Sequence, residues 1–319
     1  MPSKAKGPLL LLVTAILWGM AFVAQTTASQ DVQPFTFNAS RNFIGALFLT
    51  GVIAARKKTG SDKPPRTNAH AGDSTDVGYG KRELLVGGIA CGVVLFVASY
   101  LQQAGITSYP QGTAVSGRSG FITALYMVIV ALIGLFTGKR PHPLVFLATG
   151  VALVGMWFLC VPEGFDNVYL GDVLVFACAI GYALHIVVID RYTHVDGVRL
   201  SRVQLVTSGA LSLACMVLFE HPELSLVMAA IVPILYAGVC SDGIAYTFQI
   251  IAQQTTDPTV ASILMSLESV FAALGGWLVL SEALSPIELA GCVLVFVAVI
   301  LAQVPDFIEN ARRKRVMSN

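Results

Sequence analysis

Five ionisable side chains lie inside long apolar stretches of this chain: Arg41, Arg118, His185, Asp242 and Glu268. An arginine or aspartate at the centre of a membrane costs about 2.5–3.5 kcal/mol, so each group needs a partner or a water-filled cavity. The planar fork of an arginine suits a carboxylate or a phosphate, whereas a carboxylate or a histidine can carry a proton. These residue types therefore indicate solute binding and proton exchange inside a membrane.

Arg41 shares one predicted helix face with Asn38 and Gly45, since the three are spaced by three and four residues. The glycine allows something bulky to approach closely. Two interpretations stay open for Arg41: it binds an anionic group of a solute, or it forms an ion pair with an acidic residue such as Asp242 or Glu268. Such a pair can still be functional if solute or a proton breaks it. Arg118 lies near one end of its stretch, where it either binds solute or extends outward to the membrane surface.

Asp242 is followed by Tyr246, Gln249 and Gln253 at spacings of four, seven and eleven residues. In a helix this spacing predicts one polar face, which must look into the bundle or into a cavity. The face binds solute, with Asp242 also able to exchange a proton, or it holds helices together through hydrogen bonds.

Glu268 has Ala261, Ala272 and Gly275 on its own face. Small neighbours let another helix approach and remove water from the carboxylate, which favours a proton-carrying role; the alternative is a hydrogen-bonded carboxylate used in packing. For His185 we favour a satisfied histidine in the core over a proton relay.

The elements that must position these residues are transmembrane helices. Of the 319 residues 55% are apolar and only 12% are charged, which excludes a water-soluble globule. The windows are too long for barrel strands, so the predicted fold class is an all-α membrane protein. Ten apolar windows are predicted to span the membrane, at about 8–28, 34–55, 83–106, 113–136, 143–161, 171–190, 202–219, 229–250, 258–280 and 286–304.

The positions of the basic residues predict the orientation. When the connections are assigned alternately to two sides, 18 of the 20 Lys and Arg residues fall on the side of the N-terminus and none on the other; the remaining two are Arg41 and Arg118. The excess of positive charge inside places both termini in the cytoplasm. The connection 56–82 is polar and is predicted to be a disordered cytoplasmic linker.

A weak internal repeat relates the two halves of the chain. An offset of 164 residues aligns Trp18 with Tyr182, Val23 with Val187 and Gly7 with Gly171. Five helices per half make the halves enter the membrane in opposite directions, as in an alternating-access carrier with its site near the midplane. Trp18 and Tyr182 either stack on a ring of the solute or serve in aromatic packing.

Four strings of residues resemble the EamA-type carriers of the drug/metabolite transporter superfamily. They are Ile16-Leu17-Trp18-Gly19-Met20-Ala21-Phe22, Arg41-Asn42-Phe43, Gly120-Phe121-Ile122-Thr123-Ala124-Leu125-Tyr126, and Ser266-Leu267-Glu268-Ser269-Val270-Phe271 with Gly276-Trp277 and Glu282. The resemblance implies ten helices in two inverted five-helix repeats and the movement of small metabolites, often amino acids and frequently outward. Tyr126 joins the substrate-binding candidates. Many members have proline where this chain has Met127 and Ser269, so a helix kink at these two sites stays an open question.

We therefore expect residues 1–161 and 162–307 to form the two repeats and 308–319 a basic cytoplasmic tail that contacts lipid. The substrate-binding candidates are Trp18, Asn38, Arg41, Arg118, Tyr126, Tyr182, Asp242, Tyr246 and Gln249, and the proton-coupling candidates are Glu268, Asp242 and His185. The protein is expected to be a carrier in a bacterial-type inner membrane, with no metal, cofactor or nucleic-acid partner. Assembly into a homodimer stays open, and the less favoured alternatives are an intramembrane enzyme and a membrane sensor or scaffold.

Overall fold

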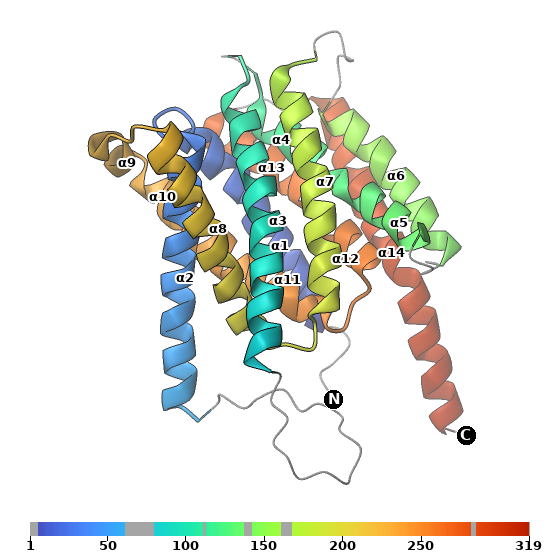
Figure 1. Cartoon of the computed structure of the whole chain (residues 1–319). Helices are drawn as coiled ribbons and strands as arrows, with labels where there is room; N and C mark the ends of the chain where they lie inside the picture. Colours follow the sequence, from blue (N-terminus) through green and yellow to red (C-terminus); the bar gives the residue numbers. More distant parts are fainter. Residues whose placement is uncertain are drawn as a thin grey trace.

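The computed structural model describes residues 6–60, 80–110, 113–136, 142–160, 168–281 and 285–318, and every regular element in those ranges is a helix (Figure 1). The first half contains α1 (Lys6–Ala28), α2 (Pro34–Lys58), α3 (Lys81–Thr107), α4 (Val115–Ala124), α5 (Tyr126–Phe136) and α6 (Pro143–Cys160). The second half contains α7 (Leu170–Arg191), α8 (Gly197–Phe219), the short α9 (Leu224–Ala229), α10 (Ile231–Tyr236), the π-helix η1 (Ala237–Ala245), α11 (Tyr246–Gln253), α12 (Pro258–Met265), α13 (Glu268–Leu280) and α14 (Pro286–Ser318).

These elements form ten spans, because α4 with α5, α10 with η1 and α11, and α12 with α13 each make one interrupted helix. Each predicted apolar window coincides with one span, so the predicted fold class is confirmed. Seven spans are long and apolar enough to cross a membrane by length and composition alone, and 143–158 and 289–302 are shorter apolar helices. The remaining span, α2, carries the polar residues Asn38, Ser40, Arg41 and Asn42.

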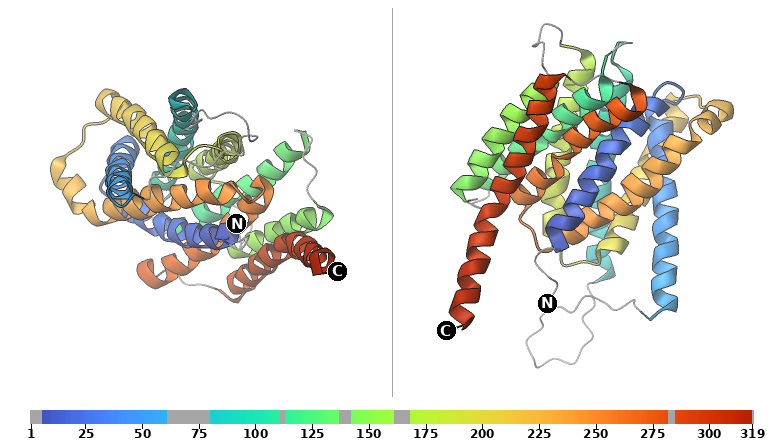
Figure 2. Two further views of the ribbon diagram at one scale, coloured as in Figure 1. Left: turned by 90° about the horizontal axis from the view of Figure 1, so that it is seen from below. Right: turned by 180° about the vertical axis from the view of Figure 1, so that it is seen from behind.

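The two halves pack as a pair of inverted repeats. Helix α3 packs on α7 and α8, and its counterpart, α10 with η1 and α11, packs on α1 and α2. Equivalent spans meet where the halves join: α2 packs on α8, α6 packs on α14, and the two broken spans pack through α4 and α13. In Figure 2, α6 and α14 lie side by side at the edge of the molecule.

The ends of the spans define two sides of the molecule. We call one the basic end, where Lys6, Lys58, Lys81 and Arg191 lie at helix ends, and the other the far end. In Figure 1 the basic end is at the bottom, where both chain termini are also marked. Most of the predicted linker, residues 61–79, lies outside the described residues. The predicted tail is continuous with the helix of α14.

Two spans break near their middle without proline. The break between α4 and α5 falls at Leu125, and the break between α12 and α13 falls at Ser266 and Leu267. At the second break the hydroxyls of Ser262, Ser266 and Ser269 each donate to the carbonyl oxygen three residues earlier, at 2.7–2.8 Å. Serine hydroxyls that compete for backbone carbonyls bend helices, which accounts for a break that the missing proline did not predict.

Helix η1 changes the register of the span that contains Asp242. The backbone N–H of Tyr246 donates to the carbonyl of Ser241, five residues earlier. This wider turn is rare and occurs frequently at functional sites. Gly45 of α2 lets η1 approach closely, since a Cβ there would lie 2.8 Å from the carbonyl oxygen of Gly238 and 3.0 Å from Cβ of Asp242. The bulky neighbour predicted for Gly45 is therefore a helix.

Candidate functional site

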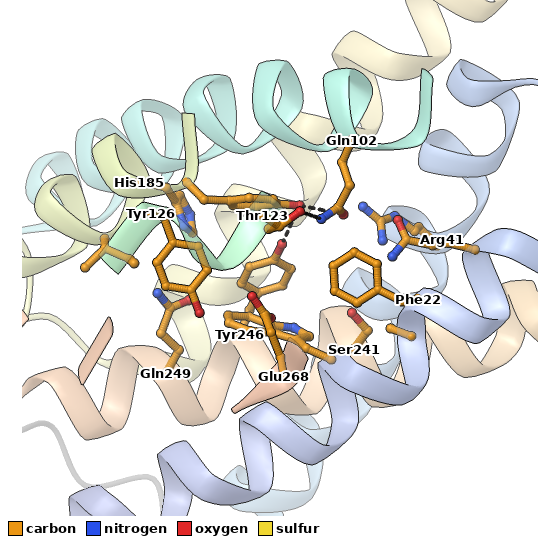
Figure 3. Close-up of a pocket in the computed structure, with 15 residues that line it drawn as sticks. Phe22, Arg41, Gln102, Thr123, Tyr126, His185, Ser241, Tyr246, Gln249 and Glu268 are labelled. Atoms are coloured by element: carbon orange, nitrogen blue, oxygen red, sulfur yellow. Dashed lines mark hydrogen bonds between the residues drawn. The ribbon is translucent and has the colours of Figure 1, made fainter. Parts of the chain in front are cut away.

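A small cavity lies where the two halves meet, between the broken helices and η1. Its accessible volume is ≈ 30 Å³, which is room for about two water molecules. Figure 3 shows the lining side chains converging from both halves of the chain. They are Trp18, Ala21, Phe22, Gln25, Arg41, Gln102, Thr123, Tyr126, Tyr182, His185, Ile186, Ser241, Tyr246, Gln249 and Glu268.

Arg41 and Asp242 face each other beside this cavity, with Nε of Arg41 3.7 Å from Oδ2 of Asp242. Both side chains are buried. The guanidinium carbon also lies 5.4 Å from the centre of the Phe37 ring. Of the two partners that the sequence left open for Arg41, the structure thus selects Asp242, at a distance too long for a strong hydrogen bond.

The aromatic side chains form a hydrogen-bonded wall. The ring centres of Trp18 and Tyr246 are 4.9 Å apart in an edge-on arrangement. The hydroxyl of Tyr246 lies 3.4 Å from that of Tyr182, which in turn donates to Oε1 of Gln102 at 3.2 Å. Nε2 of Gln102 donates to Oγ1 of Thr123 at 3.2 Å. Residues of α1, α3, α4, α7 and α11 are therefore connected across the cavity.

Several buried polar atoms on the cavity wall have no hydrogen-bond partner among the described residues. They are Nε1 of Trp18, Oε1 of Gln25, Nε of Arg41 and Oε1 of Gln249. The hydroxyl of Tyr126 and Oε1 of Glu268 also lack a partner within hydrogen-bond distance, although these two side chains interact with each other. Buried polar groups in folded proteins are nearly always hydrogen-bonded, so a cluster of exceptions around one cavity needs an explanation. Water and a polar solute are the partners that would satisfy them.

Glu268 and Tyr126 hold equivalent positions in the two broken helices. Each is the first residue after its break, since Tyr126 begins α5 and Glu268 begins α13. Both are buried and both line the cavity.

Small residues bring the neighbouring helices close to α13, as predicted. A Cβ on Gly275 would lie 2.9 Å from Sδ of Met20, and one on Gly120 would lie 2.9 Å from Cβ of Ala272.

His185 is buried, and its Nε2 lies 3.1 Å from Oε1 of Gln204. Its ring meets that of Tyr246 edge-on, with ring centres 5.7 Å apart. The histidine is thus satisfied on one nitrogen, as a core histidine would be, and it also lines the cavity.

The predicted polar face of the eighth span is divided. Tyr246 and Gln249 line the cavity together with Ser241, whereas Asp242 is turned toward Arg41. The five-residue turn of η1 is the reason, because it places residue 241 and not 242 on the face of Tyr246. Gln253 lies outside the cavity lining, and its Nε2 donates to the carbonyl of Ile186 at 3.1 Å.

Besides Asp242, two substrate-binding candidates lie outside the cavity lining. Asn38 is fully buried, with neither polar atom of its amide paired among the described residues. Arg118 lies at the far end, where its Nε and Nη2 donate to the two carboxylate oxygens of Asp172, each at 2.7 Å. The charge partner of Arg118 is thus Asp172, a residue that sequence reasoning missed.

The far-end pair is held by further contacts. The hydroxyl of Tyr109 and the backbone N–H of Tyr169 each donate to Asp172 at 2.9 Å. The guanidinium of Arg118 lies 5.0 Å from the centre of the Tyr169 ring. Burial, with Asp172 adjacent, raises the pKa of Tyr109 well above its ordinary value, so this hydroxyl stays a donor. We call these four residues the far-end latch.

Sequence reasoning missed other cavity residues: Ala21, Phe22, Gln25, Gln102, Thr123, Ile186 and Ser241. Gln25 and Gln102 carried a usable signal, because an uncharged amide in an apolar span also needs a partner. For Phe22, Thr123 and Ser241 nothing in one sequence distinguishes a cavity-facing side chain from a packed one.

Comparison with known proteins places the chain among transport proteins. The EamA-like transporter family matches residues 5–161 and 169–303. An uncharacterized transporter of Archaeoglobus fulgidus is 25% identical over 296 residues, which cover 91% of this chain and 83% of that protein. The uncharacterized transporter YoaV of Bacillus subtilis is 19% identical over 291 residues, or 89% of this chain and 92% of that protein. One crystal structure agrees in fold, with a TM-score of 0.74 and 20% identity over 95% of this chain and 98% of that one.

Proposed function

This chain belongs to the EamA-like transporter family, within the drug/metabolite transporter superfamily, and we propose that it carries small organic solutes with an amine group, amino-acid-like or amphiphilic, by alternating access. The cavity between the two inverted repeats is the proposed solute site. Transport without chemical conversion of the solute is part of the proposal. The observation that carries it is the cluster of unpaired buried polar atoms on the wall of this one cavity.

The charges around the cavity support an amine-bearing solute. Arg41 is already opposite Asp242, whereas no ion pair joins Glu268 to a described cation. A solute amine would give Glu268 the counter-charge that it lacks among the described residues, and the rings of Trp18 and Tyr126 can face a cation favourably. A solute that also has a carboxylate can compete with Asp242 for Arg41, as the 3.7 Å separation of that pair allows.

The size of the cavity supports a cycle with more than one conformation. A space of ≈ 30 Å³ holds water but no organic solute, so the halves must separate for a solute to enter. The breaks at Leu125 and at Ser266 and Leu267 lie beside the cavity and are natural points for the half-helices to move.

Proton coupling is proposed to act through Glu268. The carboxylate of Glu268 is buried, and one of its oxygens has no partner within hydrogen-bond distance among the described residues. A buried carboxylate is costly unless its charge is neutralised, which either a bound proton or a solute amine would do. Exchange of one for the other gives proton–solute antiport. Asp242 and His185 are the further candidates, the first opposite Arg41 and the second hydrogen-bonded to Gln204.

The orientation is proposed from the charge distribution, whereas the outward direction of transport is proposed from the resemblance to the family. We propose a bacterial-type inner membrane with the basic end, and so both termini, in the cytoplasm, and outward movement of the solute. A homodimer is compatible with this proposal but is not required by it, because the cavity is complete within one chain.

The proposal is tested by an uptake screen in reconstituted vesicles. Amino acids, purine bases and cationic drugs are offered as three classes, each with and without a pH gradient. We expect saturable flux for an amine-bearing class and acceleration by an opposing proton gradient. The absence of saturable flux in all three classes would overturn the proposal.

Coupling is tested separately with Glu268→Gln. We expect this variant to lose the response to a pH gradient, with Glu268→Asp restoring part of it. An unchanged pH response in Glu268→Gln would remove Glu268 from the coupling step.

A further inference from the structure

A second, much larger hollow lies in the far half of the molecule, between α4, α6 and α7. Its accessible volume is ≈ 620 Å³, and of its ten lining residues all but Asp172 are apolar. The hollow exists because α6 packs along α14 and not along α7. We call it the lateral groove.

The dimensions of the lateral groove match one leaflet of a membrane. It extends from Val168, two residues before α7, to Phe176, which covers the first seven residues of α7, or about 9 Å of helix, and the extended backbone that precedes them. Half of the hydrocarbon core of a bilayer is about 15 Å. The groove therefore lies at the depth of the acyl chains of the far leaflet.

The walls of the lateral groove are apolar and its outer end is polar. Val154, Trp157, Val173 and Phe176 line it with between 43% and 55% of their surface exposed. Asp172 lies at the outer end, next to Arg118, whose side chain is 17% exposed. An apolar slot with an ion pair at its mouth is complementary to an acyl chain attached to a charged head group.

We infer that the lateral groove is a binding site for one acyl chain of a phospholipid from the far leaflet, with the head group beside the far-end latch. In a membrane, water does not fill such a slot, and an empty one would forfeit the dispersion contacts of its walls. The inference concerns a site distinct from the cavity, so it does not depend on which solute is carried.

A lipid in this groove would touch the broken helix that also lines the cavity. Phe121, Ile122 and Leu125 of the α4 region face the groove, whereas Thr123 and Tyr126 face the cavity. The acyl chain thus supports the wall between the two spaces at the break, from the side opposite the solute.

The chain carries its own reporter for this site and a matched control. Trp157 lines the lateral groove and is 43% exposed, and Trp277 on α13 is 50% exposed but lines neither hollow. Trp18→Phe with Trp277→Phe leaves Trp157 as the only tryptophan, and Trp18→Phe with Trp157→Phe leaves Trp277. Each purified variant is titrated in detergent with phosphatidylcholine that has bromine atoms on its acyl chain, which quenches nearby tryptophan.

We expect half-quenching of Trp157 at a lipid concentration at least about fivefold below that of Trp277. Filling the groove with Val173→Phe, in the Trp157 background, should abolish that difference. Val217→Phe is the matched control, because Val217 is a lipid-exposed valine of α8 outside the groove, 68% exposed. Val154→Phe fills the groove from the opposite wall and replaces Val173→Phe should that variant fail to fold.

Two results would overturn the inference. Equal quenching of Trp157 and Trp277 would mean that the groove has no preferred lipid. Quenching of Trp277 alone would mean that protein, such as a second copy of this chain, covers the groove.

Discussion

Two arginine–carboxylate pairs lie at different depths in this molecule and differ in geometry. At the far end Arg118 grips both oxygens of Asp172 at 2.7 Å, and Tyr109 and Tyr169 supply two further donors. At the centre Arg41 and Asp242 are 3.7 Å apart, and neither Nε of Arg41 nor either oxygen of Asp242 has a described hydrogen bond.

The difference assigns different roles to the same pair of residue types. A bidentate pair with its remaining lone pairs occupied is stable as it stands and would be costly to open. A fully buried pair that is loosely joined gains from any ligand that completes its hydrogen bonds. We therefore assign the far-end pair to stability and the central pair to solute binding.

The largest expected effect is on stability, at the far end. Asp172→Asn leaves Arg118 without its counter-charge and should lower the free energy of unfolding by about 3 kcal/mol. The KM of the folded carrier for its solute should stay within about twofold of the original value, because Asp172 does not line the central cavity. Denaturant unfolding in detergent and vesicle uptake measure the two quantities, and a large rise in KM would refute this division of roles.

At the central pair we expect the larger effect on transport and the smaller effect on stability. Arg41→Gln should lower kcat/KM for the solute by about 100-fold, which corresponds to about 2.7 kcal/mol. The interaction energy between Arg41 and Asp242 in a double-variant cycle of unfolding should be smaller than that between Arg118 and Asp172. If the interaction energy between Arg41 and Asp242 is the larger of the two, the assignment of the far-end pair to stability is wrong.

The close approach of α2 to η1 can be broken without changing the charge of any residue. Gly45→Ala puts a methyl group 2.8 Å from the carbonyl oxygen of Gly238 and should lower the free energy of unfolding by about 2 kcal/mol. Gly51→Ala is the control on the same helix, where nothing lies within 4 Å, and it should stabilise by up to about 1 kcal/mol. Equal effects of the two substitutions would show that α2 and η1 can separate at no cost.

The smallest effect concerns one hydroxyl of the far-end latch. Tyr109→Phe removes a hydrogen bond to Asp172 and should lower the free energy of unfolding by about 1 kcal/mol. Because the pKa of Tyr109 is raised in the folded state, the folded chain keeps a proton that the unfolded chain loses above a pH of about 10. The original protein should therefore lose stability as the pH rises above that value, and Tyr109→Phe should lose less. Unfolding measured at pH 9 and at pH 11 checks both.

Much of the fold could be predicted from the sequence because the hydrocarbon core imposes it. Apolar windows of about 20 residues must form helices, and Lys and Arg gather at their ends. What this rule cannot predict is how one helix departs from regular geometry. The break at Ser266 depends on hydroxyls that bond backward, and η1 depends on the space that Gly45 and Gly238 provide.

The candidate site was predicted in its residue types but only partly in its geometry. Arg41 and Asp242 were recognised because a buried charge needs a partner, and the structure brings them together. Arg118 was recognised for the same reason, but Asp172, at the start of its span, resembled an ordinary helix-end carboxylate. One sequence specifies which residues need partners, whereas the packing of ten spans decides which partners they meet.

Uptake in vesicles by three matched proteins tests the central assignment most directly. The unaltered protein, Arg41→Gln and Arg118→Gln are compared at equal folded amounts, with the best solute of the three-class screen. We predict that Arg41→Gln loses saturable uptake, whereas the folded fraction of Arg118→Gln transports with nearly the original KM. Uptake that survives in Arg41→Gln but fails in Arg118→Gln would place the solute site at the far end and contradict the assignment made here.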